Sequence, residues 1–234
     1  MHMREPSRGG PEPERRSLFA DFAELVYGIF FSPVKTLKEV ASRPRSPLPA
    51  TFTAYLAVAF TGGLAGGGVW VQTMRELGQT AGMPPVAGAG LGVAVASALA
   101  AVLIGPIGLF IKTGVLGLVS SLLGGTGEPR RLLAALSLTY VPSVVTVPFS
   151  LLASAGPALG ALSAFATIGV LVWRLVLDII AIREVHGFGT GRAVAAALLP
   201  LAAVVLAAVV FFVIVFTTMA GLLAPFAPRG LPGY

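Results

Sequence analysis

The stretch VAGAGLGVAVASALAAVLIGPIGLFIKTGVLGLVSSLL, residues 86–123, decides the fold of this chain. It is almost entirely apolar, and its only charged residue is Lys112. A helix needs roughly 20 apolar residues to cross the core of a bilayer, and this run is nearly twice that long. Gly105-Pro106 divides it near the middle, and proline bends or ends a helix. The run is therefore either one long helix bent at Pro106 or two short spans.

The composition places the whole chain in a membrane. Of its 234 residues, 56% are hydrophobic and only 11% are charged, whereas soluble domains carry roughly 25% charged residues. There is no cysteine, which excludes disulfides, thiolate metal ligands and cysteine nucleophiles. Two histidines are too few for a structural zinc site, so we predict no metal and no cofactor.

Four further apolar runs are long enough to span a bilayer, at about residues 48–74, 132–152, 159–182 and 193–224. The distribution of Lys and Arg then chooses between five spans and six. With five spans, the side that holds the N-terminus carries twelve Lys and Arg, and the other side carries only Arg75 and Arg229. With six spans, both basic loops move to the outside, against the positive-inside rule. We therefore predict an all-α, five-helix membrane bundle over residues 48–226, with Lys112 snorkelling towards the cytosolic interface.

The segment before the spans divides into two parts. Residues 1–16 are polar and rich in proline, and we expect a disordered cytosolic tail. Residues 17–47 predict a pair of amphipathic helices, with the break at Ser32-Pro33, because serine suits a helix N-cap and proline the first helical position.

The apolar stripe of the first helix has two possible uses. It either lies in the membrane interface or packs onto the cytosolic ends of the spanning helices, and the two are compatible. The candidate contact residues of this pair are Phe19, Phe22, Leu25, Ile29, Phe30, Lys35 and Lys38.

Several short motifs resemble those of Yip1-domain proteins, in the family's order. Phe30-Phe31-Ser32-Pro33 precedes the first span, and the glycine loop 124–127 precedes the third. Tyr140-Val141-Pro142 lies inside the third span. Trp173 and the loop around Gly187 and Gly191-Arg192-Ala193 resemble the family's fourth span and the start of its fifth. The resemblance covers about residues 30 to 216.

The resemblance implies five spans with a cytosolic N-terminus, in agreement with the separate charge count. Eukaryotic members of this family work in early secretory traffic with Rab-type GTPases. This chain lacks their DLYGP-like motif, and its Arg-rich, Lys-poor composition is typical of bacteria, so we do not carry that role over. The expected location is the cytoplasmic membrane of a bacterium, with the N-terminus cytosolic and the C-terminus external.

Arg174 and Asp178 form the candidate intramembrane site, together with Tyr140. The two charged residues stand four positions apart on one helix face. Arg174 precedes Arg183 by nine residues, which places it about 13 Å into the membrane at 1.5 Å per residue. Ionisable residues at such depth mark functional sites by default. The alternative is an intrahelical ion pair that neutralises itself and fixes helix packing.

Glycines of the first span are candidates for close helix packing. Gly62 and Gly66 stand four residues apart, as do Gly63 and Gly67. This spacing favours close approach, either within the bundle or between two copies of the chain.

No catalytic triad, carboxylate pair or metal cluster is evident in the sequence, so we predict that the chain is not an enzyme. The leading hypothesis is a non-catalytic scaffold or accessory subunit that meets membrane lipids and a protein partner, with a homo-oligomer as a further option. The alternative is a small transporter or lipid-handling protein with a cavity around Arg174 and Asp178. Because the basic residues flank apolar runs, we expect no nucleic-acid partner.

Overall fold

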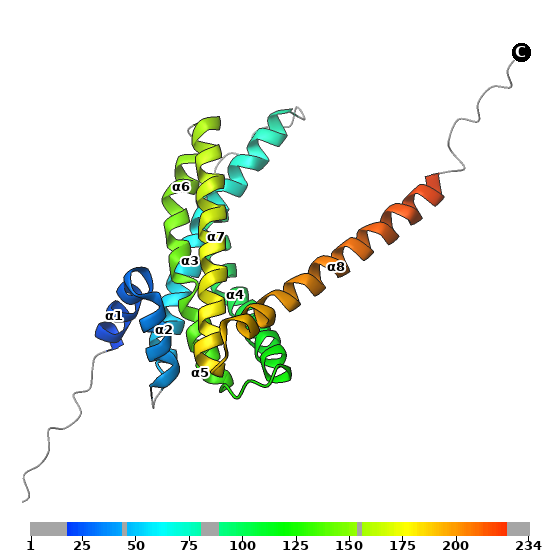
Figure 1. The fold of residues 1–234 in the computed structure, drawn as a ribbon. Helices are drawn as coiled ribbons and strands as arrows, with labels where there is room; N and C mark the ends of the chain where they lie inside the picture. The colour runs from blue at the N-terminus through cyan, green and yellow to red at the C-terminus, as the bar shows by residue number, and fades with distance from the viewer. Residues whose placement is uncertain (1–17, 44–45, 81–88, 154–155, 224–234) are drawn as a thin grey trace, which may run out of the picture.

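The computed structural model describes residues 18–43, 46–80, 89–153 and 156–223, and every element in these ranges is helical (Figure 1). The expected tail, residues 1–16, lies outside the described residues. Five helical segments are long and apolar enough to cross a membrane: Leu48–Gln79, Gly90–Leu122, Pro129–Leu152, Ala158–His186 and Thr190–Met219. The predicted all-α fold with five spans and short N-terminal helices is therefore confirmed.

The first two helices form a hairpin beside one end of the bundle. Helix α1 covers Leu18–Phe31 and α2 covers Pro33–Ser42. Pro33 begins α2, where its missing N–H removes no helical hydrogen bond. Arg43 ties the hairpin together, because its guanidinium donates to Asp21 on α1 and to Glu39 on α2. Burial alone would lower the pKa of Arg43, but the hydrogen bonds and charges of Glu39 and Asp21 outweigh it and raise that pKa.

Helices α3 (Leu48–Thr80) and α4 (Ala89–Leu122) pack against each other through small residues. A Cβ atom on Gly63 would stand 2.6 Å from the Cα of Ala98, and one on Gly67 would stand 2.6 Å from the Cα of Ala94. Gly62 and Gly66 face open space instead. Helix α4 runs through Pro106 as one helix, so residues 89–122 form a single span.

The third span is not one continuous helix. Helix α5 covers Pro129–Leu138, a 3₁₀ segment follows over Val141–Val145, and α6 covers Thr146–Leu152. Pro142 explains the break, because it has no N–H to donate and its ring would clash with the carbonyl of Leu138 in a continuous helix. The tighter 3₁₀ turns supply other bonds, such as the one from the Ser143 N–H to the Tyr140 carbonyl at 2.9 Å.

The buried core lies at the end of the bundle where α1, α2 and α5 meet. More than half of the residues in the most apolar stretch of the third span are buried, whereas the most apolar stretch of the last span has no buried residue. Many of the largest fully buried side chains come from α1, α2, α5 and α7, among them Ile29, Leu37, Leu132, Leu136 and Ile182. Helix α5 is therefore the central element, and the N-terminal hairpin completes the core around it.

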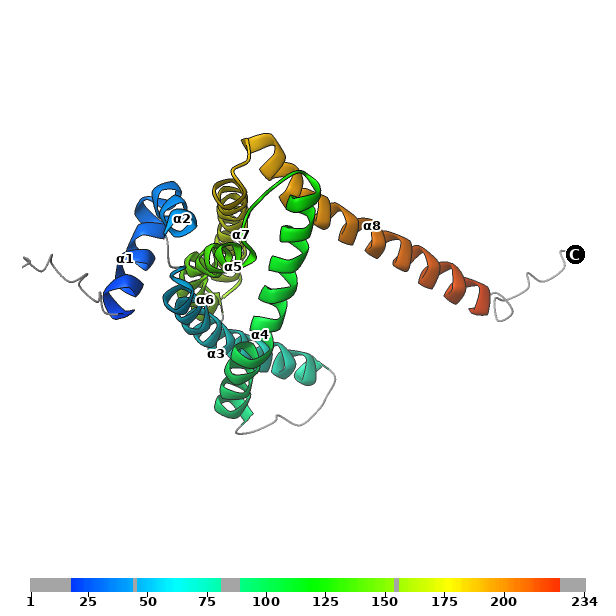
Figure 2. The same cartoon turned by 90° about the horizontal axis from the view of Figure 1, so that it is seen from below.

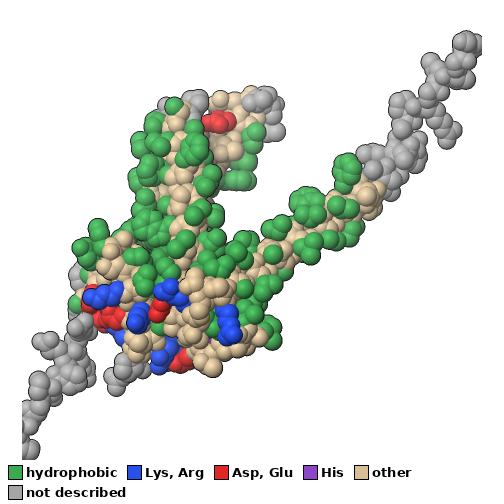
Figure 3. Space-filling model, in the orientation of Figure 1, with side chains coloured by type: hydrophobic (Ala, Val, Ile, Leu, Met, Phe, Trp, Pro, Cys, Tyr) green, Lys and Arg blue, Asp and Glu red, His purple; other side chains and the backbone are tan. Residues whose placement is uncertain are grey.

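The last two helices diverge from each other. Helix α7 (Pro157–His186) stands against α5 and α6, and α8 (Thr190–Leu223) leaves the bundle after its first turns (Figure 1). Seen from below, α8 and the α1–α2 hairpin project on opposite sides of the bundle (Figure 2). Lys and Arg gather at the end of the molecule that holds α1 and α2, and the spans above them are apolar (Figure 3).

Candidate functional site

A charged cluster lies among the spanning helices, and Asp178 of α7 is its centre. The Nζ atom of Lys112 on α4 lies 2.7 Å from Asp178 Oδ2. Thr139, at the end of α5, places its Oγ1 atom 2.7 Å from Asp178 Oδ1 and 2.8 Å from the Leu136 carbonyl oxygen. The break in the third span thus exposes a hydroxyl to the carboxylate, and both oxygens of Asp178 have a partner.

This geometry differs from the intrahelical pair and the snorkelling lysine considered from the sequence. The ion-pair partner of Asp178 is Lys112, which lies 66 positions away in the chain and points into the bundle. Among the described residues, Arg174 makes no ion pair with Asp178. Lys112 was visible as the only charge in its apolar run, but no sequence spacing could connect it to Asp178.

Arg174 rests on an aromatic side chain instead. Its Cζ atom lies 3.7 Å from the centre of the Tyr140 ring, and Lys112 Nζ lies 4.9 Å from the same centre. Tyr55 meets Tyr140 edge to face at 5.0 Å. A cation over an aromatic face is favourable, most of all when it is removed from water. The structure therefore brings the three predicted residues Arg174, Asp178 and Tyr140 into one cluster and adds Lys112, Thr139 and Tyr55.

A hollow of about 490 Å³ adjoins this cluster between α4, α7 and α8. We call it the charged hollow, and its lining includes Lys112, Leu116, Arg174, Asp178, Pro200 and Val204. Its wall is mostly apolar, and its volume is within the range of small-ligand sites, roughly 300–1,000 Å³. The outer lining residues Leu171, Leu201 and Val204 are exposed on the spanning helices, so the hollow opens sideways towards lipid.

The candidate contact residues of the N-terminal hairpin divide into two groups. Leu25 and Ile29 are buried in the core of this chain, and Phe22 and Phe30 pack against that core. Lys35 and Lys38 are exposed. The side chain of Phe19 lies outside the described residues. The sequence reasoning missed the exposed aromatic pair, Tyr27 and Phe31, whose rings stack at 4.5 Å.

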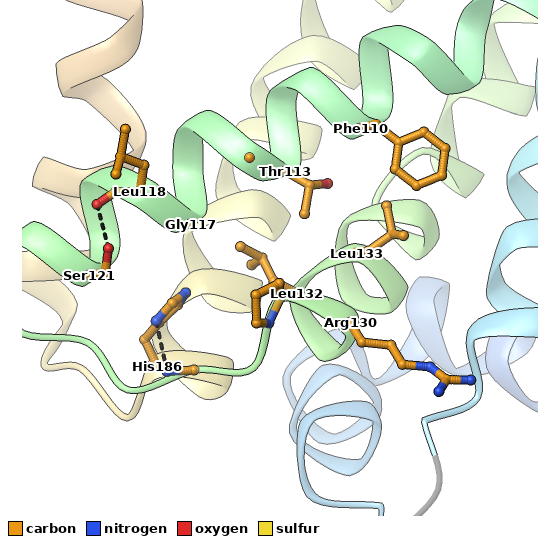
Figure 4. A pocket seen from close by; sticks show the side chains of 12 residues that line it. Phe110, Thr113, Gly117, Leu118, Ser121, Arg130, Leu132, Leu133 and His186 are labelled. Atoms are coloured by element: carbon orange, nitrogen blue, oxygen red, sulfur yellow. Dashed lines mark hydrogen bonds between the residues drawn. The ribbon is translucent and has the colours of Figure 1, made fainter.

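The glycine loop before α5 wraps around His186 at the end of α7. The Gly127 N–H donates to His186 Nδ1 at 3.1 Å (Figure 4). The imidazole also stacks on Phe188. A Cβ atom on Gly125 or Gly127 would stand 2.6 or 2.7 Å from Nδ1, so the loop reaches the ring only because both residues are glycine. Gly187, at φ 66°, ends α7 in the left-handed conformation that favours glycine.

A second hollow of about 490 Å³ lies above this ring, between α4 and α5 (Figure 4). Gly117 and Ser121 of α4 line one side, and Leu132 of α5 lines the other. Because Nδ1 of His186 accepts a hydrogen bond, the ring proton is on Nε2. That atom is buried and has no hydrogen-bond partner among the described residues. Arg130 lines the mouth, and its guanidinium points away from the ring.

Comparison with known protein families matches residues 27–224 to the Yip1 domain. The match covers the end of α1, all of α2, all five spans and every residue of the charged cluster. Searches of curated proteins and of solved structures gave no significant match to the chain.

Proposed function

Because this chain belongs to the Yip1 domain family, which consists of generally non-catalytic multi-pass membrane proteins, we propose that it is a membrane scaffold or accessory subunit without catalytic activity of its own. Its partner is another membrane or membrane-surface protein. The proposed location is the cytoplasmic membrane of a bacterium, with the basic end of the molecule in the cytosol, as the positive-inside rule favours.

The observation that carries this proposal is the free surface of α8. Every residue from Leu201 to Met219 is exposed, so the rest of the described chain leaves this part of the helix uncovered, although Leu201 and Val204 border the charged hollow. Only its first turns reach the core, through Ala193, Ala196 and Ala197. Spanning helices associate by close van der Waals packing, which small residues promote. Ala203 and Ala207, four residues apart, give the free part of α8 such a surface for a helix of a partner.

The exposed face of the N-terminal hairpin is a second contact surface at the cytosolic end. The stacked rings of Tyr27 and Phe31 lie on α1, and Lys35 and Lys38 are exposed on α2. Aromatic and basic side chains together suit a membrane-surface protein or the anionic inner leaflet. The buried Leu25 and Ile29 hold this surface on the bundle.

Site-specific photocross-linking from α8 tests the proposal. We expect a photoreactive amino acid that replaces Phe212 in native membranes to give one discrete protein adduct, which mass spectrometry identifies. An adduct of two copies of this chain would indicate a homo-oligomer. Phe165 on α7 is the matched position for the same replacement, because it is equally apolar and exposed. The proposal is wrong if the photoreactive residue at position 212 yields only lipid adducts.

The charged hollow favours a second candidate function, lipid handling or transport of a small molecule. Lys112, Arg174 and Asp178 meet beside an apolar wall that opens towards lipid. Five spans do not divide into two equal inverted repeats, as many transporters do, so we place lipid binding before transport.

A further inference from the structure

The charged hollow has an excess of positive charge. Lys112 and Asp178 neutralise each other across 2.7 Å, and both carboxylate oxygens already have partners. Arg174 is then the surplus cation, with no ion-pair partner among the described residues. An unpaired charge at this depth in a membrane is costly, and a bound anion would remove that cost.

Arg174 also has hydrogen-bonding capacity to spare. Its Nε atom is buried without a hydrogen-bond partner among the described residues, and its Cζ atom lies over the Tyr140 ring, 3.7 Å from the ring centre. The cation–π contact with the Tyr140 ring uses the charge of the guanidinium, but it takes up none of the five N–H donors of Arg174. A planar fork of this kind matches the two oxygens of a phosphate or carboxylate.

We propose that the charged hollow binds the oxyanion head of an amphiphile, with Arg174 as its cation and the apolar wall of α7 and α8 against its chain. This inference rests on the second candidate function, lipid handling, and names the ligand class for it. The head would lie beside Arg174 and Lys112, and the chain would run along Leu171, Leu201 and Val204 towards the open side. An anionic phospholipid has both parts.

Lipid binding to the purified full chain tests the inference. Phosphatidylglycerol and phosphatidylcholine with identical acyl chains are titrated in detergent, and native mass spectrometry counts the bound lipid. We expect phosphatidylglycerol to bind more tightly, and Arg174→Gln to weaken it about tenfold to a hundredfold, as the loss of a charged hydrogen bond does. Arg192→Gln makes the same charge change at an exposed position outside the hollow and keeps wild-type binding. Equal effects of the two variants would overturn the inference.

A second pair of variants leaves the charges intact. Val204→Trp fills the hollow from its exposed rim, whereas Val205→Trp adds the same bulk at an exposed position outside the lining. Only Val204→Trp should reduce the binding of phosphatidylglycerol. If both lipids bind equally and Val204→Trp weakens both, lipid handling stands and the oxyanion site fails. If inorganic phosphate binds with the same dependence on Arg174, the ligand is a free anion and the amphiphile is excluded.

Discussion

Lys112 and Asp178 hold each other in a place where neither charge is stable alone. The pair joins α4 to α7, and the side chains are only 25% and 11% exposed. Removing one partner of a buried pair leaves the other charge without compensation, which costs more than the pair itself contributes. Thr139 and Tyr140 complete the surroundings from the broken third span. With Tyr55 of α3, the cluster therefore draws on four of the five spans.

We predict that Asp178→Asn lowers the free energy of unfolding by about 3–5 kcal/mol, because Lys112 then stays buried without a counter-ion. The double variant Lys112→Met/Asp178→Asn should lose less unfolding free energy than the two single variants, Lys112→Met and Asp178→Asn, lose together. Unfolding in mixed micelles, followed by circular dichroism, measures the two single variants and the double variant. Glu128→Gln breaks the exposed pair with Arg131 and should cost about 1 kcal/mol or less. Additive losses for Lys112 and Asp178 would contradict the pairing.

At the scale of elements, the two glycine pairs of α3 have different environments. Gly63 and Gly67 meet the backbone of α4, and Gly62 and Gly66 meet nothing in the described chain. The sequence identified all four as candidates for close packing, but their spacing is the same on both faces. The rotation of α3 against its neighbour decides which pair is used, and that rotation depends on the whole interface.

We predict that Gly63→Ala lowers the unfolding free energy by about 1–3 kcal/mol, the usual cost of overpacking. Its Cβ would stand 2.8 Å from the carbonyl oxygen of Ser97, so the backbone of α4 would have to move. Gly62→Ala adds the same atom one position away in open space, and should leave stability unchanged or raise it by up to about 1 kcal/mol through helix propensity. The unfolding experiment described above compares the two, and equal losses would show that Gly63 does not face α4.

The elements were more predictable from the sequence than their contacts. Apolar length identifies a spanning helix, the distribution of Lys and Arg decided between five spans and six, and the break at Ser32-Pro33 could be predicted locally. Contacts could not, because an apolar side chain such as Phe212 is equally stable against lipid and against protein. The divergence of α8 was therefore invisible in its hydropathy. The partner of Asp178 was equally hidden, because Lys112 and Asp178 come together only when α4 and α7 pack.

At the scale of the whole molecule, the charges define its two ends. Lys35 and Lys38 lie on α2 of the N-terminal hairpin, Arg130 lies in the first turn of α5, and Arg192 lies in the first turn of α8. Arg75 lies near the opposite end of α3 from the hairpin. Because α4 is one span, the glycine loop at 124–128 returns to the same side as the hairpin. A break in α4 at Pro106 into two spans would reverse every element after it. The orientation therefore rests on the continuity of one helix.

We predict that a membrane-impermeant maleimide added to intact cells labels Arg75→Cys and does not label Lys38→Cys or Thr126→Cys. All three positions are exposed on this cysteine-free chain, and the positive-inside rule puts the last two in the cytosol. Opening the cells should make all three reactive. Val209→Cys, in the middle of α8, should stay unlabelled throughout, because hydrocarbon disfavours the reactive thiolate. Labelling of Thr126→Cys in intact cells would mean that residues 89–122 cross the membrane twice. The five-span topology would then be wrong, even if Lys38→Cys stays unlabelled in the same cells.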